Sequence, residues 1–476
     1  MKLLDEINTR QKKNAAIFGD ADMTGREWLV LFLGPAFFIY GHLKALAGDR
    51  LGAFLKDVRR RSRSLNIEIF DSRGIPMFGS DCNNPAIDEL KEMILTAVNR
   101  GGSDIFLDPA GAGQYALRMR IDGSLVVIKN MTSDFGDNVV NAIKVAAGMD
   151  ISEKRRPQDG SFSAGHPGGN VAFRVATVGA FGGEKVAIRL LGTDAGPKSL
   201  EEIGFSGGQL EVLKNAVSLS SGMILMCGGT GSGKTTTLYA LIDNIDYSLK
   251  NVISIEDPVE RVLPRVSQME VNVKAGITFA GILRNALRQN PDVICLGEIR
   301  DEETAEIAVH AAQTGHLIIS TVHSNDAVDT IDRLGSLGVP LRSLAATVKV
   351  IVNQRLARRL CPSCKKPAEN VPDDWMRYFE ANNIPVTGVY QAVGCPECSN
   401  TGYRGRVACL DVLVLDQTIR AELEKENVSL TRIKELVSGS TGNRSMLYHG
   451  AVLAASGVSS LEEISRITLS IDGGVK

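Results

Sequence analysis

The sequence predicts an α/β protein of about three domains, followed by a helical C-terminal region. Short apolar runs that end in polar clusters recur through the middle of the chain, as the strands of a parallel sheet do. One of these runs leads directly into a glycine-rich loop and a helix start. Hydrophobic residues make up 44% of the 476 residues, which is enough for a large core. The formal net charge of −2 gives no basic excess, so direct nucleic-acid binding is not expected.

Residues 1–84 are expected to form an N-terminal adaptor region. An apolar run from Trp28 to Tyr40 is shorter than a membrane span, and a basic cluster follows at residues 56–63. Together they fit either contact with an anionic membrane surface or an apolar helix packed on another domain, and we favour the helix. No secretory signal is expected, because charged and polar residues fill the start of the chain.

Residues 85–195 alternate between helical and strand patterns, which predicts an α/β domain. Helices are expected at 87–99 and 136–147. The expected strands are 104–107, 115–121, 124–128, 171–178 and 185–191. Four arginines lie on or beside these strands, and β-propensity gives no reason for them. Either they face solvent or they have a function; they are Arg118, Arg120, Arg174 and Arg189.

A glycine-containing stretch at 196–208 is expected to link this domain to a nucleotide-binding core at 209–360. The core contains a G-x-x-x-x-G-K-T motif after an apolar strand, which is the context that a P-loop requires. Its residues, with the one that follows, are Gly228, Gly229, Thr230, Gly231, Ser232, Gly233, Lys234, Thr235 and Thr236. We expect Lys234 to reach the β- and γ-phosphates of ATP or GTP and the Thr235 hydroxyl to bind Mg²⁺.

Three further strands of the core end in polar clusters, which should converge on the phosphates because ligands bind at the carboxyl ends of parallel strands. Glu298 follows the strand 293–296 and is the best candidate to position Mg²⁺ and polarise the attacking water. Other acidic residues follow the strand 252–255; they serve the surroundings of the metal or its water network, or they only cap a helix or face solvent. They are Glu256, Asp257 and Glu260.

Two histidines flank the strand 317–321. The spacing of His316 and His323 puts them on opposite faces, so a paired metal site is not expected. Sensing of the γ-phosphate, contact with a neighbouring element and a simple hydrogen-bonding role all remain open for each of them.

Four of the eight cysteines form two Cys-x-x-Cys pairs: Cys361, Cys364, Cys395 and Cys398. Four thiolates in this arrangement can close a tetrahedral structural Zn²⁺ site, whereas a redox motif would occur once and in another context. The pattern indicates a reducing compartment and a zinc module at 361–410. The remaining residues, 411–476, show a strand and then helical patterns, with a capping-box-like start at Ser460.

The motif set resembles the secretion ATPases of type II secretion and type IV pilus assembly. The P-loop, Ile255 to Glu260, Gly297 to Asp301 and Thr314 to Ala327 are similar, in this order, to the family's Walker A motif, aspartate box, atypical Walker B motif and histidine box. Upstream, Arg118 to Gly123 and Glu153 to Gly160 resemble its PAS-like domain. The resemblance covers roughly residues 85–410.

The resemblance implies a PAS-like domain, a RecA-like ATPase domain and a ring of six subunits. It makes Glu298 the catalytic glutamate and has Arg174 and Arg189 reach the nucleotide phosphates as the ring closes. Implied partners are an inner-membrane platform protein and a membrane-anchored adaptor, which would hold a cytoplasmic protein at the inner membrane. The tetracysteine module favours an assembly motor over a retraction motor. A weakly hydrolysing scaffold of the same machine and the ATPase of a conjugative pilus remain alternatives.

Overall fold

The computed structural model describes residues 67–78, 84–111, 113–166, 169–191, 199–439 and 445–468. The apolar run 28–40 and the basic cluster 56–63 lie outside these residues. The chain divides into two compact units, the larger of which contains the whole second sheet described below. Within the described ranges, no helix combines the length and the hydrophobicity needed to cross a membrane.

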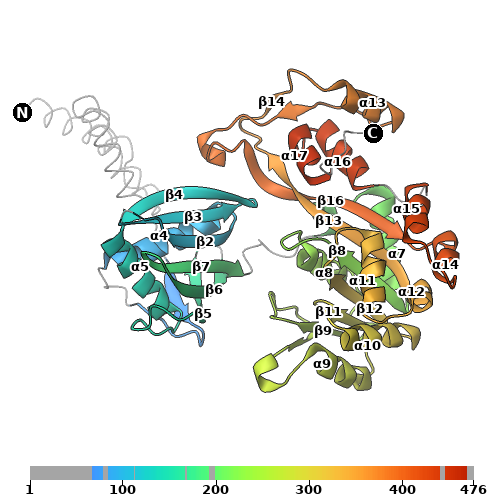
Figure 1. Ribbon diagram of the computed structural model, residues 1–476, viewed down its shortest axis with the longest axis horizontal. Helices are drawn as coiled ribbons and strands as arrows, with labels where there is room; N and C mark the ends of the chain where they lie inside the picture. The colour runs from blue at the N-terminus through green and yellow to red at the C-terminus, as the bar shows by residue number, and fades with distance from the viewer. Residues whose placement is uncertain are drawn as a thin grey trace, which may run out of the picture. The chain divides into compact units, whose positions relative to one another are not determined.

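The first sheet has seven strands in the order β1-β5-β6-β7-β2-β3-β4 (Figure 1). Its strands are β1 (Glu68–Asp71), β2 (Gly102–Pro109), β3 (Gln114–Ile121), β4 (Ser124–Thr132), β5 (Gln158–His166), β6 (Gly169–Ala180) and β7 (Gly183–Leu191). Helices α4 (Pro85–Asn99) and α5 (Ser133–Ala146) accompany it. Along β6, buried Val171, Phe173 and Val175 alternate with exposed residues, so one face of this strand belongs to the core.

Strand β5 was missed by the sequence analysis. Its residues are rich in glycine and serine, which have low strand propensity. The strand forms because it is hydrogen-bonded between β1 and β6, with Phe162 directly opposite Phe173. These two rings stack with centroids 4.7 Å apart, which is a tertiary contact that local sequence does not encode.

The second sheet has the order β10-β9-β11-β12-β8-β13-β16, with β16 antiparallel to β13 and every other pair parallel. Its strands are β8 (Gly222–Cys227), β9 (Val252–Glu256), β10 (Ser267–Glu270), β11 (Val293–Leu296), β12 (Leu317–Val322), β13 (Val348–Leu360) and β16 (Tyr403–Val414). The predicted core strands are confirmed to within a residue. Cys227 pairs with Val322, and Leu296 with Ile255, so the carboxyl ends of these strands lie at one edge.

Helices cover both faces of the second sheet, which explains why its strands are continuous apolar runs. Met223 and Leu225 of β8 belong to one core cluster, and Ile224 and Met226 belong to another. The helices of this part are α6 (Leu200–Ile203), α7 (Gly207–Ser218), α8 (Lys234–Asp243), α9 (Phe279–Ala286), α10 (Glu302–Gln313), α11 (Ala327–Ser336) and α12 (Leu341–Thr347). Short 3₁₀ turns lie at Val273–Ala275 and Leu287–Gln289.

The expected linker at 196–208 contains regular structure where it is described. Ser199 caps α6 in a capping box with Glu202, and the buried Leu200 and Phe205 join the core of the second sheet. Gly204 ends α6, and Gly207 and Gly208 begin the next helix, α7, so the described residues 199–208 do not form an extended connection.

The C-terminal part adds small elements, some around a third core cluster and others on the first core cluster of the second sheet. They are β14 (Lys366–Pro367), α13 (Asp373–Ala381), β15 (Tyr390–Gln391), a 3₁₀ turn (Pro396–Cys398), α14 (Gln417–Leu423), α15 (Leu430–Gly439), α16 (Met446–Ala455) and α17 (Leu461–Thr468). Trp375 and Phe379 of α13 join the same cluster as Ala454 and Ile464. The expected start of the last helix is confirmed, since Ser460 Oγ accepts a hydrogen bond from the Glu463 N–H.

Candidate active site

The predicted P-loop lies between β8 and α8, and its glycines are required by geometry. Gly228 and Gly233 have φ values of 140° and 89°, which disfavour any residue with a Cβ. A Cβ on Gly228 would also lie 2.4 Å from the backbone carbonyl oxygen of Gln354, and one on Gly233 would lie 2.7 Å from Nε2 of the Gln354 side chain. The loop is therefore wrapped tightly against β13.

Lys234 is the first residue of α8 and is held inside the loop. Its ammonium group donates to the carbonyls of Gly228 and Gly229 at 2.8 and 3.0 Å, and the residue is only 8% exposed. Burial lowers the pKa of Lys234. A buried cation that is bonded to neutral carbonyls is poised to exchange them for anionic oxygens.

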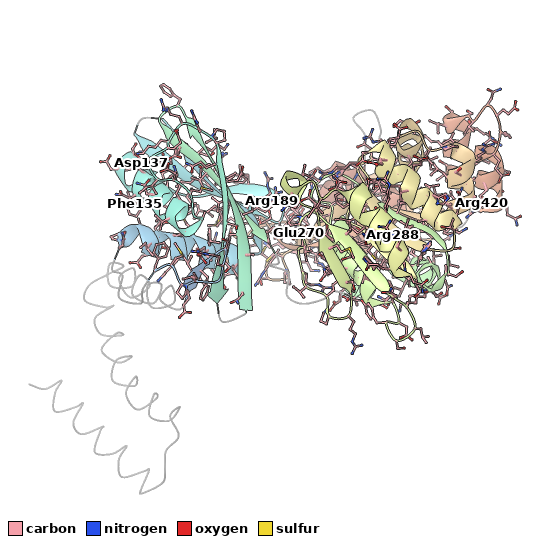
Figure 2. The ribbon with its side chains drawn as sticks, turned by 90° about the horizontal axis from the view of Figure 1, so that it is seen from below. Phe135, Asp137, Arg189, Glu270, Arg288 and Arg420 are labelled. Carbon is pink, nitrogen blue, oxygen red and sulfur yellow. The ribbon has the colours of Figure 1, made fainter. Side chains whose placement is uncertain are left out.

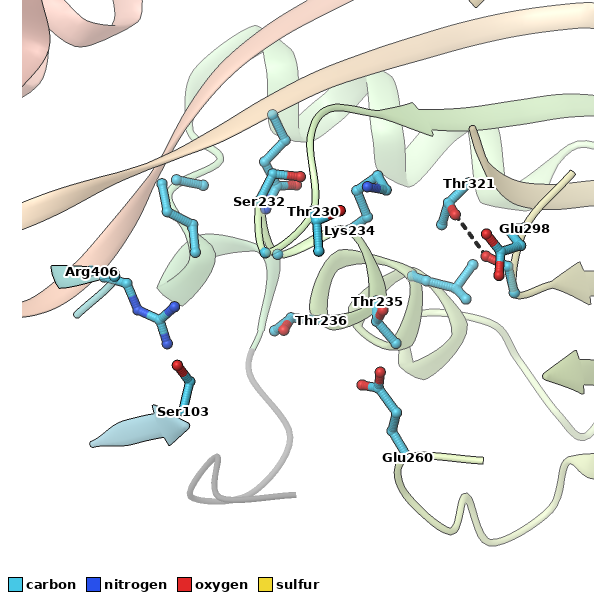
Figure 3. Close-up of a pocket in the computed structure, with 18 of the residues that line it drawn as sticks. Ser103, Thr230, Ser232, Lys234, Thr235, Thr236, Glu260, Glu298, Thr321 and Arg406 are labelled. Atoms are coloured by element: carbon cyan, nitrogen blue, oxygen red, sulfur yellow. Dashed lines mark hydrogen bonds between the residues drawn. The ribbon is translucent and has the colours of Figure 1, made fainter. Parts of the chain in front are cut away.

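The polar residues predicted at the ends of the strands of the second sheet line one cavity beside the P-loop. Figure 3 shows Lys234 and Thr235 at the start of α8, Glu298 near Thr321, and Glu260 pointing toward Thr235. The residues in and beyond the strands of the second sheet that line this cavity include Thr230, Gly231, Ser232, Gly233, Lys234, Thr235, Thr236, Glu256, Asp257, Glu260, Glu298 and His323. The convergence that was expected from strand ends is present in the structure.

Glu298 is a buried carboxylate with two basic neighbours. One oxygen lies 2.5 Å from the Arg300 guanidinium, and the other lies 3.4 Å from Nε2 of His323. The backbone just before Glu298 is fixed as well. The Gly297 N–H donates to the Ile255 carbonyl, and the Gly297 carbonyl accepts from the Thr321 hydroxyl. Burial, followed by repulsion from Lys234, lowers the pKa of His323 and so favours the neutral imidazole.

The three acidic residues at and beyond the end of β9 differ in their surroundings. Glu256 is 3% exposed and accepts hydrogen bonds from three protein side chains. Asp257 and Glu260 lie on the loop beyond it and line the cavity. Only these two lie past the end of the strand, where a ligand reaches an open sheet.

The structure separates the two histidines. His323 follows β12 at the phosphate edge, whereas His316 precedes β12 and its ring Nδ1 lies 3.0 Å from the Ala311 carbonyl. Six residues of extended strand span about 20 Å, so His316 lies at the opposite edge of the sheet. Of the roles left open for His316, the structure fits contact with a neighbouring element, because its ring meets the end of α10 and not the phosphate edge.

Three of the four strand arginines have acidic partners on β2. Asp104 lies 3.0 Å from Arg189 of β7 and 3.5 Å from Arg120 of β3, so cations from both neighbouring strands flank it. Arg118 pairs with Asp108 at 2.6 Å. Arg189 is visible in Figure 2 and its side chain is still 64% exposed. Arg174 is exposed on β6.

The four predicted zinc ligands come together. The four Sγ atoms lie within 4.8 Å of one another, and three of their separations are 3.7, 3.8 and 3.9 Å. Four ligands at about 2.3 Å in a tetrahedron are about 3.8 Å apart, so the set fits one Zn²⁺. Backbone N–H groups of Gly394 and Gly402 donate to two of the sulfurs, as thiolate acceptors require.

Two side chains at the site were not found from the sequence. Gln354 accepts from the Thr237 hydroxyl at 2.7 Å and packs under the P-loop, and Tyr239 of α8 bonds to Glu256. A signal for Gln354 existed, because Asn353-Gln354 ends the apolar run 350–352. Tyr239 had no such signal, since an aromatic residue on a helix normally indicates core packing.

Comparison with known proteins adds the family. Residues 80–466 match the family model described as "Type II/IV secretion system protein". Type II secretion system protein HxcR of Pseudomonas aeruginosa is 40% identical over 384 residues, which are 81% of this chain and 77% of that protein. Type IV pilus assembly ATPase PilB of the same organism is 38% identical over 387 residues, 81% and 68% of the two chains.

A solved structure supports the fold. The crystal structure of the pilus retraction motor PilT with bound ADP has a TM-score of 0.53 and 26% identity, and the match covers 80% of this chain and 97% of that chain.

Proposed function

Because this chain belongs to the type II/IV secretion system protein family, we propose that it is a motor ATPase that drives assembly of a type IV pilus or a type II secretion pseudopilus. The observation that carries the proposal is that Glu298 lines the same cavity as Lys234 and Thr235. A phosphate-binding lysine and a carboxylate suited to hold water are the two groups that ATP hydrolysis demands of the protein.

Each side chain then has a task. Lys234 leaves the loop carbonyls and binds the β- and γ-phosphate oxygens, while the P-loop N–H groups and the start of α8 favour the anion. Glu298 accepts a hydrogen bond from the attacking water and aims it at the γ-phosphorus, and Arg300 and His323 hold that carboxylate in place. The Thr235 hydroxyl would hold Mg²⁺, which neutralises charge on the phosphates when bound.

The remaining assignments follow the resemblance. The chain would act as a homohexamer in the cytoplasm, held at the inner membrane by a platform protein and an adaptor. Arg174 and Arg189 would reach the phosphates when the ring closes, and the exposure of both side chains is compatible with that. The tetracysteine cluster would hold a structural Zn²⁺ and favours an assembly motor.

The test uses purified full-length protein with Mg²⁺ and ATP. Lys234→Ala should weaken ATP binding more than tenfold, because it removes the ammonium group that binds the phosphates. Glu298→Gln should bind ATP within about twofold of wild type and lose at least about 100-fold in turnover. Glu306→Gln, on an exposed position of α10, is the matched control and should keep both properties.

The scaffold alternative and a wrong assignment of Glu298 would each give a different result. A scaffold binds ATP, and its turnover is equally low in wild type and in Glu298→Gln, with and without membranes that contain the platform protein. Full turnover in Glu298→Gln would contradict the assignment of the catalytic carboxylate.

A further inference from the structure

Tyr239 joins the helix that begins at the P-loop to the acidic loop beside it. It lies on α8 and is 6% exposed. Its hydroxyl donates to Glu256 at 2.5 Å and accepts from the backbone N–H groups of Glu260 and Arg261, both at 3.2 Å. One oxygen atom therefore contacts the start of this loop and its far end, and it uses all its hydrogen-bonding capacity to do so.

Glu256 is the fixed end of this connection. Its other oxygen accepts from Ser254 at 2.6 Å and from Gln268 at 3.0 Å. A buried carboxylate with three donors is stabilised inside the protein and has little capacity left for a ligand. Gln268 also donates to the Arg261 carbonyl, so the same network holds the end of the loop.

A second contact strengthens the link between loop and helix. The Arg261 guanidinium lies over the Tyr239 ring, 5.0 Å from its centroid, and pairs with Asp243 at the end of α8 at 2.8 Å. The planar cation thus bridges two side chains of one helix. Burial, with the hydrogen bond to Glu256, raises the pKa of Tyr239, so the hydroxyl keeps the proton that it donates.

We propose that Tyr239 is a positioning residue that couples phosphate binding at the P-loop to the loop 256–261 and so places Glu260 for hydrolysis. Helix α8 begins with Lys234 and Thr235, the residues that meet the phosphates and Mg²⁺ in the proposed function, on which this inference rests. A shift of α8 on phosphate binding moves the Tyr239 hydroxyl and the loop with it. Figure 3 shows Glu260 directed from that loop toward Thr235.

The test compares Tyr239→Phe with Tyr247→Phe. Tyr247 is a matched control because its half-buried hydroxyl donates to the Ile242 carbonyl at 2.9 Å, at the far end of α8. Hydrogen–deuterium exchange of the peptide that contains 256–261 is followed with and without Mg²⁺ and a non-hydrolysable ATP analogue. We expect the analogue to slow exchange at least about fivefold in wild type and control but not in Tyr239→Phe.

Turnover supplies the second measurement. Tyr239→Phe should lower kcat about tenfold with KM for ATP within about twofold, because the loop is misplaced while the P-loop is intact. Wild-type kcat, or full protection of the loop by the analogue, in this variant would overturn the inference. If wild type hydrolyses no ATP, the proposed function fails, and the exchange result still decides the coupling.

A further variant tests the same coupling if Tyr239→Phe does not fold. Arg261→Met removes the guanidinium from the Tyr239 ring and from Asp243 at a partly exposed position. The same loss of loop protection is expected, and retained protection in Arg261→Met would count against the coupling.

Discussion

Replacing Glu463 by glutamine tests how the last described helix, α17, is anchored. The residue is 1% exposed and accepts hydrogen bonds from the guanidinium groups of Arg358 at 2.7 Å and of Arg466 at 2.7 and 2.8 Å. Burial disfavours the charged form, but the hydrogen bonds from Arg466 and Arg358 outweigh it and lower the pKa of Glu463 to about 2. The carboxylate is the hub of an ion cluster that joins α17 to β13.

The pKa shift of Glu463 sets the size of its contribution to stability. The ordinary value is 4.5, and one pKa unit corresponds to about 1.4 kcal/mol, so the ionised group contributes about 3 kcal/mol to the free energy of unfolding at pH 7. Because the folded-state pKa is the lower one, this contribution is complete above pH 4.5. It falls as the pH drops toward 2. Glu463→Gln keeps the shape and removes the charge, which leaves two guanidinium groups without their partner.

Urea unfolding followed by tryptophan fluorescence measures the loss. Trp375 belongs to the same core cluster as Ile464 of α17, so it reports on this part of the chain. At pH 7, Glu463→Gln should unfold with about 3 kcal/mol less free energy than wild type, and the exposed neighbour Glu462→Gln should stay within about 0.5 kcal/mol. A loss in Glu463→Gln no larger than that of the control would refute the reasoning.

Three other variants test separate parts of the account. Cys395→Ser should abolish bound zinc by metal analysis and lower the melting temperature while ATP binding persists; an unchanged zinc content would count against the site. Burial lowers the pKa of His449 to about 4 from 6.5, so the unfolded chain takes up the proton first and stability falls by about 2 kcal/mol between pH 7.5 and 5. His449→Asn should flatten this dependence, and an equal slope in the variant would exclude His449 as its source. Arg174→Ala should lower turnover about tenfold or more with ATP binding retained, whereas the exposed Arg155→Ala should not; wild-type rates in Arg174→Ala would reject its assignment.

The family and the α/β fold were predictable because phosphate binding imposes a strict local pattern. A loop that wraps a phosphate needs glycines at fixed positions and a strand before it, so residues 223–236 alone identify the phosphate-binding loop. The cysteine pairs were equally readable, since metal geometry restricts their spacing. Both motifs can be recognised in short stretches of sequence, without knowing which distant residues pack against them.

Non-local pairings explain what was missed. Arg120 and Arg189 had no visible reason in their own strands because their common partner, Asp104, lies on a third strand between them. Glu256 shared a motif with Asp257 and Glu260, yet only the fold shows that its carboxylate turns toward Tyr239. Periodicity specifies which face a residue occupies but not which side chain it meets there.

Packing of the predicted zinc module also depends on residues that are distant in sequence. Trp375, which lies between the two cysteine pairs, packs with residues of α16 and α17, more than 70 residues further along the chain. The module therefore shares its core with the C-terminal helices, and the proposed Zn²⁺ would add to a packed core.

Specific ATPase activity across a series of protein concentrations tests the central claim most directly, with Glu298→Gln as the control. A ring motor should show activity per chain that rises as hexamers form, in parallel with their mass measured by light scattering, while the control remains inactive throughout. Activity per chain that stays constant while the oligomer forms, or equal inactivity of both proteins at every concentration in the presence of platform-containing membranes, would contradict the account.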